Sequence, residues 1–301
     1  MAGVVFLDGE FVAPEQAQMS IFDAGFMYSD TVYDVLSGWN GWLFKLDEHL
    51  ERFANSCRGF RLDNRYSPDE VRRIVGECVD RSGLENTYVK VEITRGVIPH
   101  NGRDLRDATQ RFIAYAVPYI WIWGQEKCRD GVNVHVSSKY RRIPSQAVDA
   151  RFKNYNRADL VQARLDGYEL GCDDAMLVGT DGALTEGFGW NVMLVADGQV
   201  ATPESNILHG VTRETVAELC ELEGLTYESR RVEPGELETA EEVFAATTAG
   251  GIMPITALDG KPVGSGAAGP TTRRLQDLYW SKREEGWHGT RVADVLAAAP
   301  A

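Results

Sequence analysis

A lysine among aromatic residues is the first side chain with a chemistry of its own. Lys153 stands in residues 151–155, which read Arg-Phe-Lys-Asn-Tyr, and the chain holds only seven lysines. An amine that its neighbours shield from water can lose its proton and form a Schiff base with an aldehyde. A solvated surface lysine is the ordinary alternative, because lysine is seldom fully buried.

A carboxylate in an apolar stretch comes next. Glu186 lies in residues 184–191, Leu-Thr-Glu-Gly-Phe-Gly-Trp-Asn, shortly after an Asp-Gly turn. Burying a carboxylate is costly unless it has a partner. A protonated heterocyclic nitrogen would be such a partner.

Three further features suit a phosphate. Residues 247–251, Thr-Thr-Ala-Gly-Gly, follow an apolar run and let backbone N–H groups approach an anion. Residues 210–212, Gly-Val-Thr, open a predicted helix whose first N–H groups lack intrahelical partners. Arg52, one helical turn after His49, could bind a phosphate through two nitrogens. Each feature also has an ordinary interpretation, namely a glycine turn, a threonine helix cap and a surface ion pair.

Together these residues offer the groups that pyridoxal 5′-phosphate requires. They are an amine for its aldehyde, an anion for its ring nitrogen, and donors for its phosphate.

The elements that must position these groups follow from turn residues and periodicity. Asn-Gly and Asp-Gly pairs between apolar runs predict tight antiparallel hairpins. They occur at residues 8–9, 40–41, 181–182, 197–198 and 259–260. Apolar spacing and capping residues predict helices. These helices cover residues 46–61, 67–83, 212–224 and 270–282, with Asp47 as a cap of the first.

Strands are predicted at residues 87–94 and 111–123, and Pro118 interrupts the second. This run is too long and too aromatic for one strand, so we interpret its end as the crossing between domains. The fold class is therefore α+β, with helices packed on two largely antiparallel sheets. We expect a small N-terminal domain over residues 1–120, a linker over 121–128 and a larger domain over 129–301.

Composition narrows the partners. The formal net charge is −14, which argues against nucleic acid and anionic membranes. No run approaches the ~20 apolar residues of a membrane span, and the first residues lack the basic start of a signal peptide. Five widely spaced cysteines favour free thiols in a cytoplasmic protein. Five scattered histidines give no metal-binding spacing.

With these motifs the sequence resembles the fold-type IV pyridoxal-phosphate enzymes, or class IV aminotransferases. That class contains branched-chain and D-amino-acid aminotransferases and aminodeoxychorismate lyase, and the sequence is most similar to the (R)-selective amine transaminases. The motifs occur in the family's order over nearly the whole chain. They are residues 33–35, 46–52, 153–154, 184–187, 208–213 and 247–255.

The resemblance implies a role for each site residue. Lys153 would be the catalytic Schiff-base lysine, and Glu186 would pair with the cofactor's ring nitrogen. Further cofactor contacts would come from Arg52, Leu208, Val211, Thr212, Thr247 and Thr248. The substrate pocket would be formed by Tyr33, Val35, Tyr88, Thr247 and Ala249, with Arg103 for a substrate carboxylate. The resemblance also implies a small N-terminal α/β domain, a larger C-terminal domain of antiparallel sheet and helices, and a homodimer with the cofactor between the domains.

The implied activity is ping-pong transamination from an (R)-amine or D-amino acid to a keto acid such as pyruvate. Two departures bear on the substrate. Tyr28 stands where (R)-amine transaminases usually carry histidine or arginine. Residues 88–92, Tyr-Val-Lys-Val-Glu, lack the tyrosine-arginine pattern of branched-chain enzymes. The alternatives are a branched-chain or D-amino-acid aminotransferase, a lyase of the aminodeoxychorismate type, and a binding module without catalysis.

Overall fold

The computed structural model describes residues 2–99 and 104–298 of the chain. The chain divides into two compact units, and each is described by itself. The first comprises Met1–Ile120, Phe152–Asn156 and Arg283–Ala301. The second comprises Trp121–Arg151 and Arg157–Lys282.

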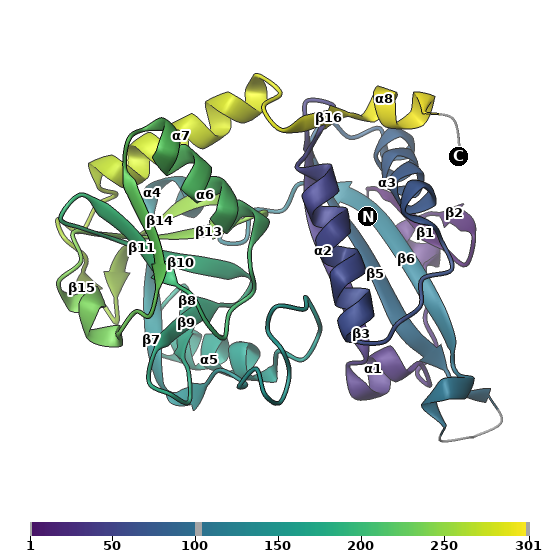
Figure 1. Ribbon diagram of the computed structural model, residues 1–301, viewed down its shortest axis with the longest axis horizontal. Coiled ribbons are helices and arrows are strands. Elements are labelled where there is room, and N and C mark those ends of the chain that lie inside the picture. The colour runs from purple at the N-terminus through teal and green to yellow at the C-terminus, as the bar shows by residue number, and fades with distance from the viewer. Residues whose placement is uncertain (1, 100–103, 299–301) are drawn as a thin grey trace. The chain divides into compact units, whose positions relative to one another are not determined.

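The first unit is built on a seven-stranded sheet in the order β16-β4-β3-β5-β6-β1-β2, with antiparallel pairings (Figure 1). Its strands are β1 (Val4–Leu7), β2 (Glu10–Val12), β3 (Thr31–Trp39), β4 (Trp42–Phe44), β5 (Thr87–Val97), β6 (Thr109–Pro118) and β16 (Gly289–Arg291). Its helices are α1 (Ala24–Tyr28), α2 (Leu46–Gly59), α3 (Pro68–Ser82) and α8 (Val292–Ala297), with 3-10 turns at Pro14–Gln16 and Leu105–Asp107.

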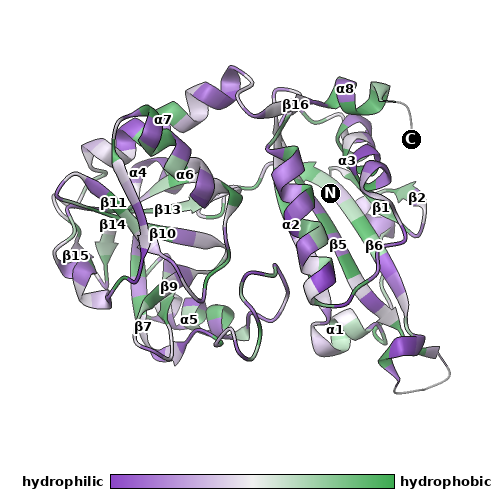
Figure 2. Ribbon diagram, in the orientation of Figure 1, coloured by the Kyte–Doolittle hydropathy of each residue, from purple (hydrophilic) through white to green (hydrophobic). Residues whose placement is uncertain are grey.

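Helices α2 and α3 cover one face of this sheet. Alternate residues of β5, among them Val89 and Val91, are buried and join Leu36 of β3 in the core beneath the helices. Figure 2 shows hydrophobic stretches on β5 and β6, whereas hydrophilic residues predominate on α2. Because successive side chains of a strand point to opposite faces, the residues that alternate with these buried ones point to the other face of the sheet.

The ends of the two helices show how far local signals decide the structure. Ser67 caps α3 in a capping box with Glu70, as the sequence predicts. Helix α2 instead follows Lys45, which is left-handed at φ 47° and gives no side-chain cap. The expected cap Asp47 lies inside the first turn, where its charge still favours the helix dipole.

The second unit contains a nine-stranded sheet in the order β12-β11-β10-β13-β14-β7-β8-β9, with β15 paired to β14. A further pairing of β9 with β10 closes six of these strands into a ring. The strands are β7 (Val132–Arg141), β8 (Asp174–Val178), β9 (Leu184–Gly187), β10 (Trp190–Ala196), β11 (Gln199–Pro203), β12 (Thr226–Arg230), β13 (Glu242–Thr247), β14 (Gly251–Leu258) and β15 (Lys261–Pro262). The helices are α4 (Gln125–Asp130), α5 (Ala158–Glu169), α6 (Val211–Leu222) and α7 (Pro270–Glu284), with a 3-10 turn at Pro234–Glu238.

Three pairings in this sheet are parallel, namely β7–β8, β7–β14 and β11–β12. Parallel neighbours need a long crossover, and α5 and α6 lie in two of these connections. The remaining pairings are antiparallel, so the sheet is mixed but largely antiparallel, as expected.

The expected division of the chain differs from these units in two places. Helix α4 begins at Gln125, inside the expected linker 121–128, and belongs to the second unit. The chain also returns twice to the first unit. The segment Phe152–Asn156 lies along β3, and β16 pairs with β4. Such returns depend on pairings between distant residues, which local patterns do not reveal.

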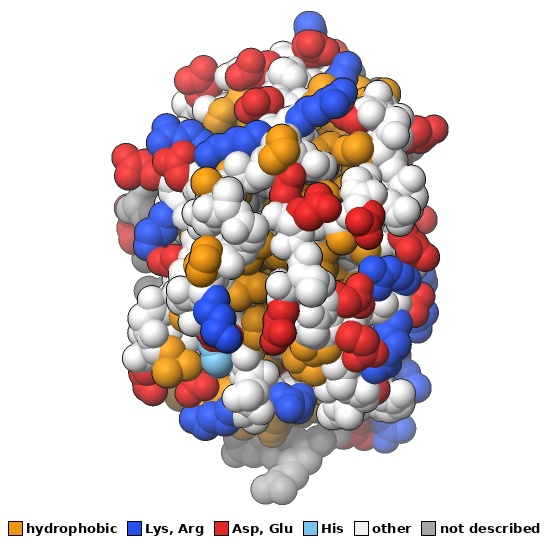
Figure 3. All heavy atoms as spheres, turned by 90° about the vertical axis from the view of Figure 1, so that its left-hand side faces the viewer, with side chains coloured by type: hydrophobic (Ala, Val, Ile, Leu, Met, Phe, Trp, Pro, Cys, Tyr) orange, Lys and Arg blue, Asp and Glu red, His pale blue; other side chains and the backbone are white. Residues whose placement is uncertain are grey.

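No helix in residues 2–99 and 104–298 is both long and apolar enough to cross a membrane. The molecular face in Figure 3 carries acidic and basic side chains interspersed with apolar ones.

Candidate active site

Lys153 lies on a segment that occupies an open strand edge. Strand β4 pairs only with the end of β3, so the first half of β3 is left to Phe152–Asn156. Tyr33 N–H donates to the Lys153 carbonyl at 3.0 Å, and Tyr155 N–H donates to the Thr31 carbonyl at 3.2 Å. These bonds fix the backbone on both sides of the lysine.

The Lys153 side chain is half-buried against an aromatic ring. Its Nζ lies 4.8 Å from the ring centroid of Tyr33. Lys90 Nζ lies at the same distance, 4.8 Å, from that ring. The face of an aromatic ring attracts a cation, so this contact holds the Lys153 amine beside Tyr33.

Three predicted substrate residues share one face of the sheet. Tyr33, Val35 and Ser37 are spaced two residues apart on β3, so their side chains point to the same side of the sheet. Tyr88 on β5 pairs with Ser37 and therefore points to that side as well. The same face carries a polar group that the sequence analysis missed. Tyr155 Oη–H donates to Glu92 Oε2 at 2.5 Å, and Lys90 Nζ lies 2.7 Å from that oxygen.

This polar group changes the acidity of the tyrosine. Burial and the Glu92 carboxylate raise the pKa of Tyr155 far above its usual range, so the phenol stays protonated. The period-2 pattern of residues 88–92 carries the signal for Lys90 and Glu92, which alternate with buried valines. The contribution of Tyr155 comes from the distant segment and has no such signal.

Arg52 has a buried partner that the sequence analysis did not name. Its Nε and Nη2 donate to the two carboxylate oxygens of Asp34, at 2.7 and 2.8 Å. His49 Nδ1 lies 2.7 Å from Asp34 Oδ1. The surface ion pair considered for Arg52 is replaced by this two-point contact with a residue on β3.

Glu186 lies in the second unit and is 5% exposed. Arg142 Nε donates to its Oε1 at 3.2 Å, and the backbone N–H of Leu208 donates to its Oε2 at 2.9 Å. Asn191 Nδ2 lies 3.4 Å from the same Oε2 and 2.9 Å from the Leu208 carbonyl oxygen. The structure thus brings Glu186 and the backbone of Leu208 together.

The start of α6 lies directly after this group. The helix begins at Val211, and its N-cap Gly210 provides no side-chain hydrogen bond to the first turn. A Cβ at Gly210 would lie 2.2 Å from Asn191 Oδ1, so the glycine permits a close approach. Val211 and Thr212 are buried in this first turn, whose N–H groups suit an anion.

A second turn of small residues follows β13. Thr247 Oγ1 donates to the Gly189 carbonyl at 2.7 Å, and Ala249 is buried. Gly251 has a φ of 72°, which favours glycine, and a Cβ there would lie 2.6 Å from the Tyr279 ring. Thr248 is half-buried in this turn. Arg103 lies outside the described residues.

Each unit carries groups that suit a part of pyridoxal phosphate. The first unit supplies a half-buried amine and an arginine, and the second supplies a buried carboxylate and a helix start without a side-chain cap. Within the described part of the chain, no group of His, Cys, Asp and Glu could hold a metal ion. All five cysteines are buried and free, and burial raises the pKa of Cys57 to about 12, which makes that thiol a poor nucleophile.

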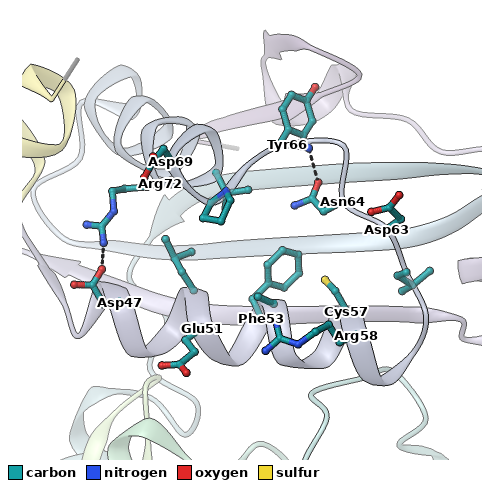
Figure 4. Close-up of a pocket in the computed structure, with 15 residues that line it drawn as sticks. Asp47, Glu51, Phe53, Cys57, Arg58, Asp63, Asn64, Tyr66, Asp69 and Arg72 are labelled. Atoms are coloured by element: carbon teal, nitrogen blue, oxygen red, sulfur yellow. Dashed lines mark hydrogen bonds and ion pairs between the residues drawn. The ribbon is translucent and has the colours of Figure 1, made fainter. Parts of the chain in front are cut away.

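A groove of about 450 Å³ lies between α2 and α3. Its lining contains none of the residues assigned to the cofactor or to the substrate. Its floor includes core residues such as Phe53 and Val71, and an ion pair of Asp47 with Arg72 lies across one end (Figure 4). It therefore adds nothing to the site.

Comparisons with known proteins all find aminotransferases. The family model described as amino-transferase class IV matches residues 31–258. A D-alanine aminotransferase of Bacillus licheniformis is 32% identical over 275 residues, covering 90% of this chain and 94% of the relative. A putative branched-chain-amino-acid aminotransferase of Methanocaldococcus jannaschii is 29% identical over 293 residues, covering 96% and 99%.

Other relatives differ in length. The chain spans 49% of branched-chain-amino-acid aminotransferase-like protein 2 of Arabidopsis thaliana, with 30% identity over 278 residues.

Among solved structures, a T.th. branched-chain amino acid aminotransferase with pyridoxamine 5′-phosphate aligns with a TM-score of 0.89 and 28% identity. That alignment covers 97% of this chain and 99% of the other.

Proposed function

We propose, because this chain belongs to the amino-transferase class IV family, that it moves an amino group from an (R)-amine or a D-amino acid to a keto acid such as pyruvate. The chain is an aminotransferase of fold type IV, and its cofactor is pyridoxal 5′-phosphate. The observation that carries the proposal is Lys153, half-buried over Tyr33 with its backbone fixed on both sides.

When bound, the cofactor supplies an aldehyde that bonds amines and a ring that takes up electrons. Lys153 would supply the amine for the aldehyde at rest. Once the substrate's amino group has displaced it, the freed Nζ would take the proton from the amine-bearing carbon of the substrate. Glu186 would accept a hydrogen bond from the ring nitrogen and favour its protonated form. The start of α6 and Arg52 would bind the phosphate. Because the enzyme holds the amino group between two substrates, the kinetics are ping-pong.

Two observations favour (R)-amines or D-amino acids. D-alanine aminotransferases are among the relatives, and their names support a D-amino acid donor. Residues 88–92, on the strand that carries Tyr88, lack the tyrosine-arginine pattern of the branched-chain enzymes. The branched-chain relatives support a branched-chain aminotransferase as the second candidate. A lyase of the aminodeoxychorismate type is the third.

A half-reaction separates these candidates. The holoenzyme is mixed separately with (R)-1-phenylethylamine, D-alanine and L-leucine, with (S)-1-phenylethylamine as the control. We expect the cofactor's visible absorbance to be lost with the (R)-amine or D-alanine. Loss with L-leucine alone would assign a branched-chain enzyme. Pyruvate or ammonia formed beyond one equivalent per enzyme, without an amino acceptor, would assign a lyase.

The functional unit is a homodimer in this proposal. Apolar side chains next to and within α1 are strongly exposed, including Phe22 at 65% and Phe26 at 67%, together with Ile21 and Met27. A contiguous exposed apolar patch is typical of a protein interface, and we assign it to a second copy of this chain. We place the protein in the cytoplasm, since its five cysteines are free and buried.

A further inference from the structure

We propose that Asp34 and Ser56 are positioning residues, which fix Arg52 and Lys153 in one hydrogen-bonded network and thereby set where the cofactor's phosphate and aldehyde bind. The inference rests on the proposed function, because it assigns the phosphate to Arg52 and the aldehyde to Lys153. All four residues belong to the first unit.

Asp34 orients the guanidinium. Its carboxylate on β3 is completely buried and receives both Nε and Nη2 of Arg52. A two-point contact fixes the plane of a guanidinium, which a single ion pair does not. Although burial alone raises it, Arg52 and His49 hold the pKa of Asp34 well below its usual range, so the carboxylate remains charged.

His49 completes this half of the network. Its Nδ1 lies 2.7 Å from Asp34 Oδ1. Burial lowers the pKa of His49, while Asp34 offsets part of that effect, and the charges of Arg52 and Lys153 lower it further. The imidazole is therefore neutral at pH 7. It hydrogen-bonds to Asp34 Oδ1 and leaves Arg52 as the charged partner of the carboxylate.

Ser56 joins the lysine to the same helix. Its Oγ accepts a hydrogen bond from the Lys153 backbone N–H at 2.9 Å and donates one to the Arg52 carbonyl oxygen at 2.9 Å. The serine is completely buried. One hydroxyl thus connects the backbones of the two residues assigned to the cofactor.

The spacing on α2 explains why these contacts converge. His49, Arg52 and Ser56 are separated by three and four residues, so their side chains lie on one face of the helix. That face meets Asp34 on β3 and the segment that carries Lys153. If the network only stabilised the core, its loss would weaken the binding of every ligand equally. If it positions Arg52 and Lys153, loss of Asp34 weakens phosphate binding, and loss of Ser56 slows bond formation at the aldehyde.

Asp34→Asn tests the first half. The variant keeps the shape of the side chain but removes the charge that holds Arg52. With cofactor-free protein, we expect its affinity for pyridoxal phosphate to fall on the order of 10-fold or more, and its affinity for pyridoxal, which lacks the phosphate, to be unchanged. Asp174→Asn is the matched control, because Asp174 is a buried acid of the second unit that accepts from Trp123 and Trp190. Equal affinities in wild type and Asp34→Asn, or an equal loss for both ligands, would overturn the role of Asp34.

Ser56→Ala tests the second half and is a milder change if Asp34→Asn fails to fold. We expect the rate of bond formation at Lys153 to fall about 10-fold with pyridoxal phosphate and with pyridoxal, while inorganic phosphate competes as in wild type. Ser82→Ala is the control, since Ser82 is a half-buried serine of the same unit whose hydroxyl donates to the Val79 carbonyl oxygen on α3. Wild-type rates in Ser56→Ala would refute its role. If wild type itself forms no bond at Lys153, the proposed function fails, whereas normal wild type with normal variants refutes this inference alone.

Discussion

The chemistry of this protein depends on where a few ionisable groups lose contact with water. Lys153 is half-buried over a tyrosine ring, and Glu186 is buried with donors from Arg142, Asn191 and Leu208. Lys153 and Glu186 stand out in the sequence by their aromatic and apolar neighbours, and their roles come from the family resemblance. Asp34 and Ser56 were not predicted, because their significance lies in contacts between β3, α2 and a segment about a hundred residues further on.

At the residue scale, Glu186→Gln tests the anion for the cofactor ring. The amide keeps the hydrogen bond from Leu208 but cannot favour a protonated ring nitrogen. We expect kcat to fall on the order of 10²-fold, with the cofactor still bound to Lys153. Glu242→Gln is a matched control, because Glu242 is a buried glutamate that accepts from the backbone of Thr271 and Thr272. A Glu186→Gln enzyme with the wild-type rate would show that another group protonates the ring.

At the scale of elements, turns and caps were predictable where the signal is local. The five Asn-Gly and Asp-Gly pairs that were predicted to form hairpins do so, and Pro118 ends β6. Helix α5 was missed because it buries only Leu160, Ala163 and Gly167, which gives a weak helical pattern. The parallel pairings were also missed, since they join strands that are distant in the sequence.

Gly210→Ala tests the start of α6 as an anion site. The backbone of Gly210, with a φ of −71°, accepts alanine, but the new Cβ would lie 2.2 Å from Asn191 Oδ1. Displacing Asn191 disturbs the Leu208 carbonyl and the helix start, so we expect affinity for pyridoxal phosphate to fall on the order of 10-fold. The control is Gly235→Ala, where no atom lies within 4 Å of the added Cβ. If both variants bind the cofactor as wild type does, α6 does not hold the phosphate.

At the scale of the whole molecule, stability should depend on the buried histidine of the first unit. Burial, partly offset by Asp34, lowers the folded pKa of His49 below its usual value near 6.5. Below pH ~6.5 the unfolded chain then binds more protons than the folded protein. The free energy of unfolding therefore falls as the pH falls, by at most about 1.4 kcal/mol per pH unit. We expect His49→Gln to flatten this decline between pH 7 and pH 5 in urea unfolding, whereas the exposed-site control His288→Gln keeps it. An unchanged slope in His49→Gln would contradict this assignment.

The quaternary state is a second prediction at this scale. Phe22→Asp and Phe26→Asp place charges in the exposed apolar patch near α1. If a second copy covers that patch, sedimentation should show a dimer for wild type and a monomer for the double variant. Leu170→Asp is the control, because Leu170 is exposed at 63% in the second unit. A monomeric wild type, or a dimer that survives the double variant, would count against this interface.

The central claim is that Lys153 bonds the cofactor's aldehyde, and chemical trapping tests it most directly. The native holoenzyme is treated with borohydride, digested and analysed by mass spectrometry, with Lys153→Ala as the control. We expect the phosphopyridoxyl group on the peptide that contains Lys153, and on no peptide of the variant. A reduced adduct on another lysine of the wild-type protein, or no adduct, would contradict the account.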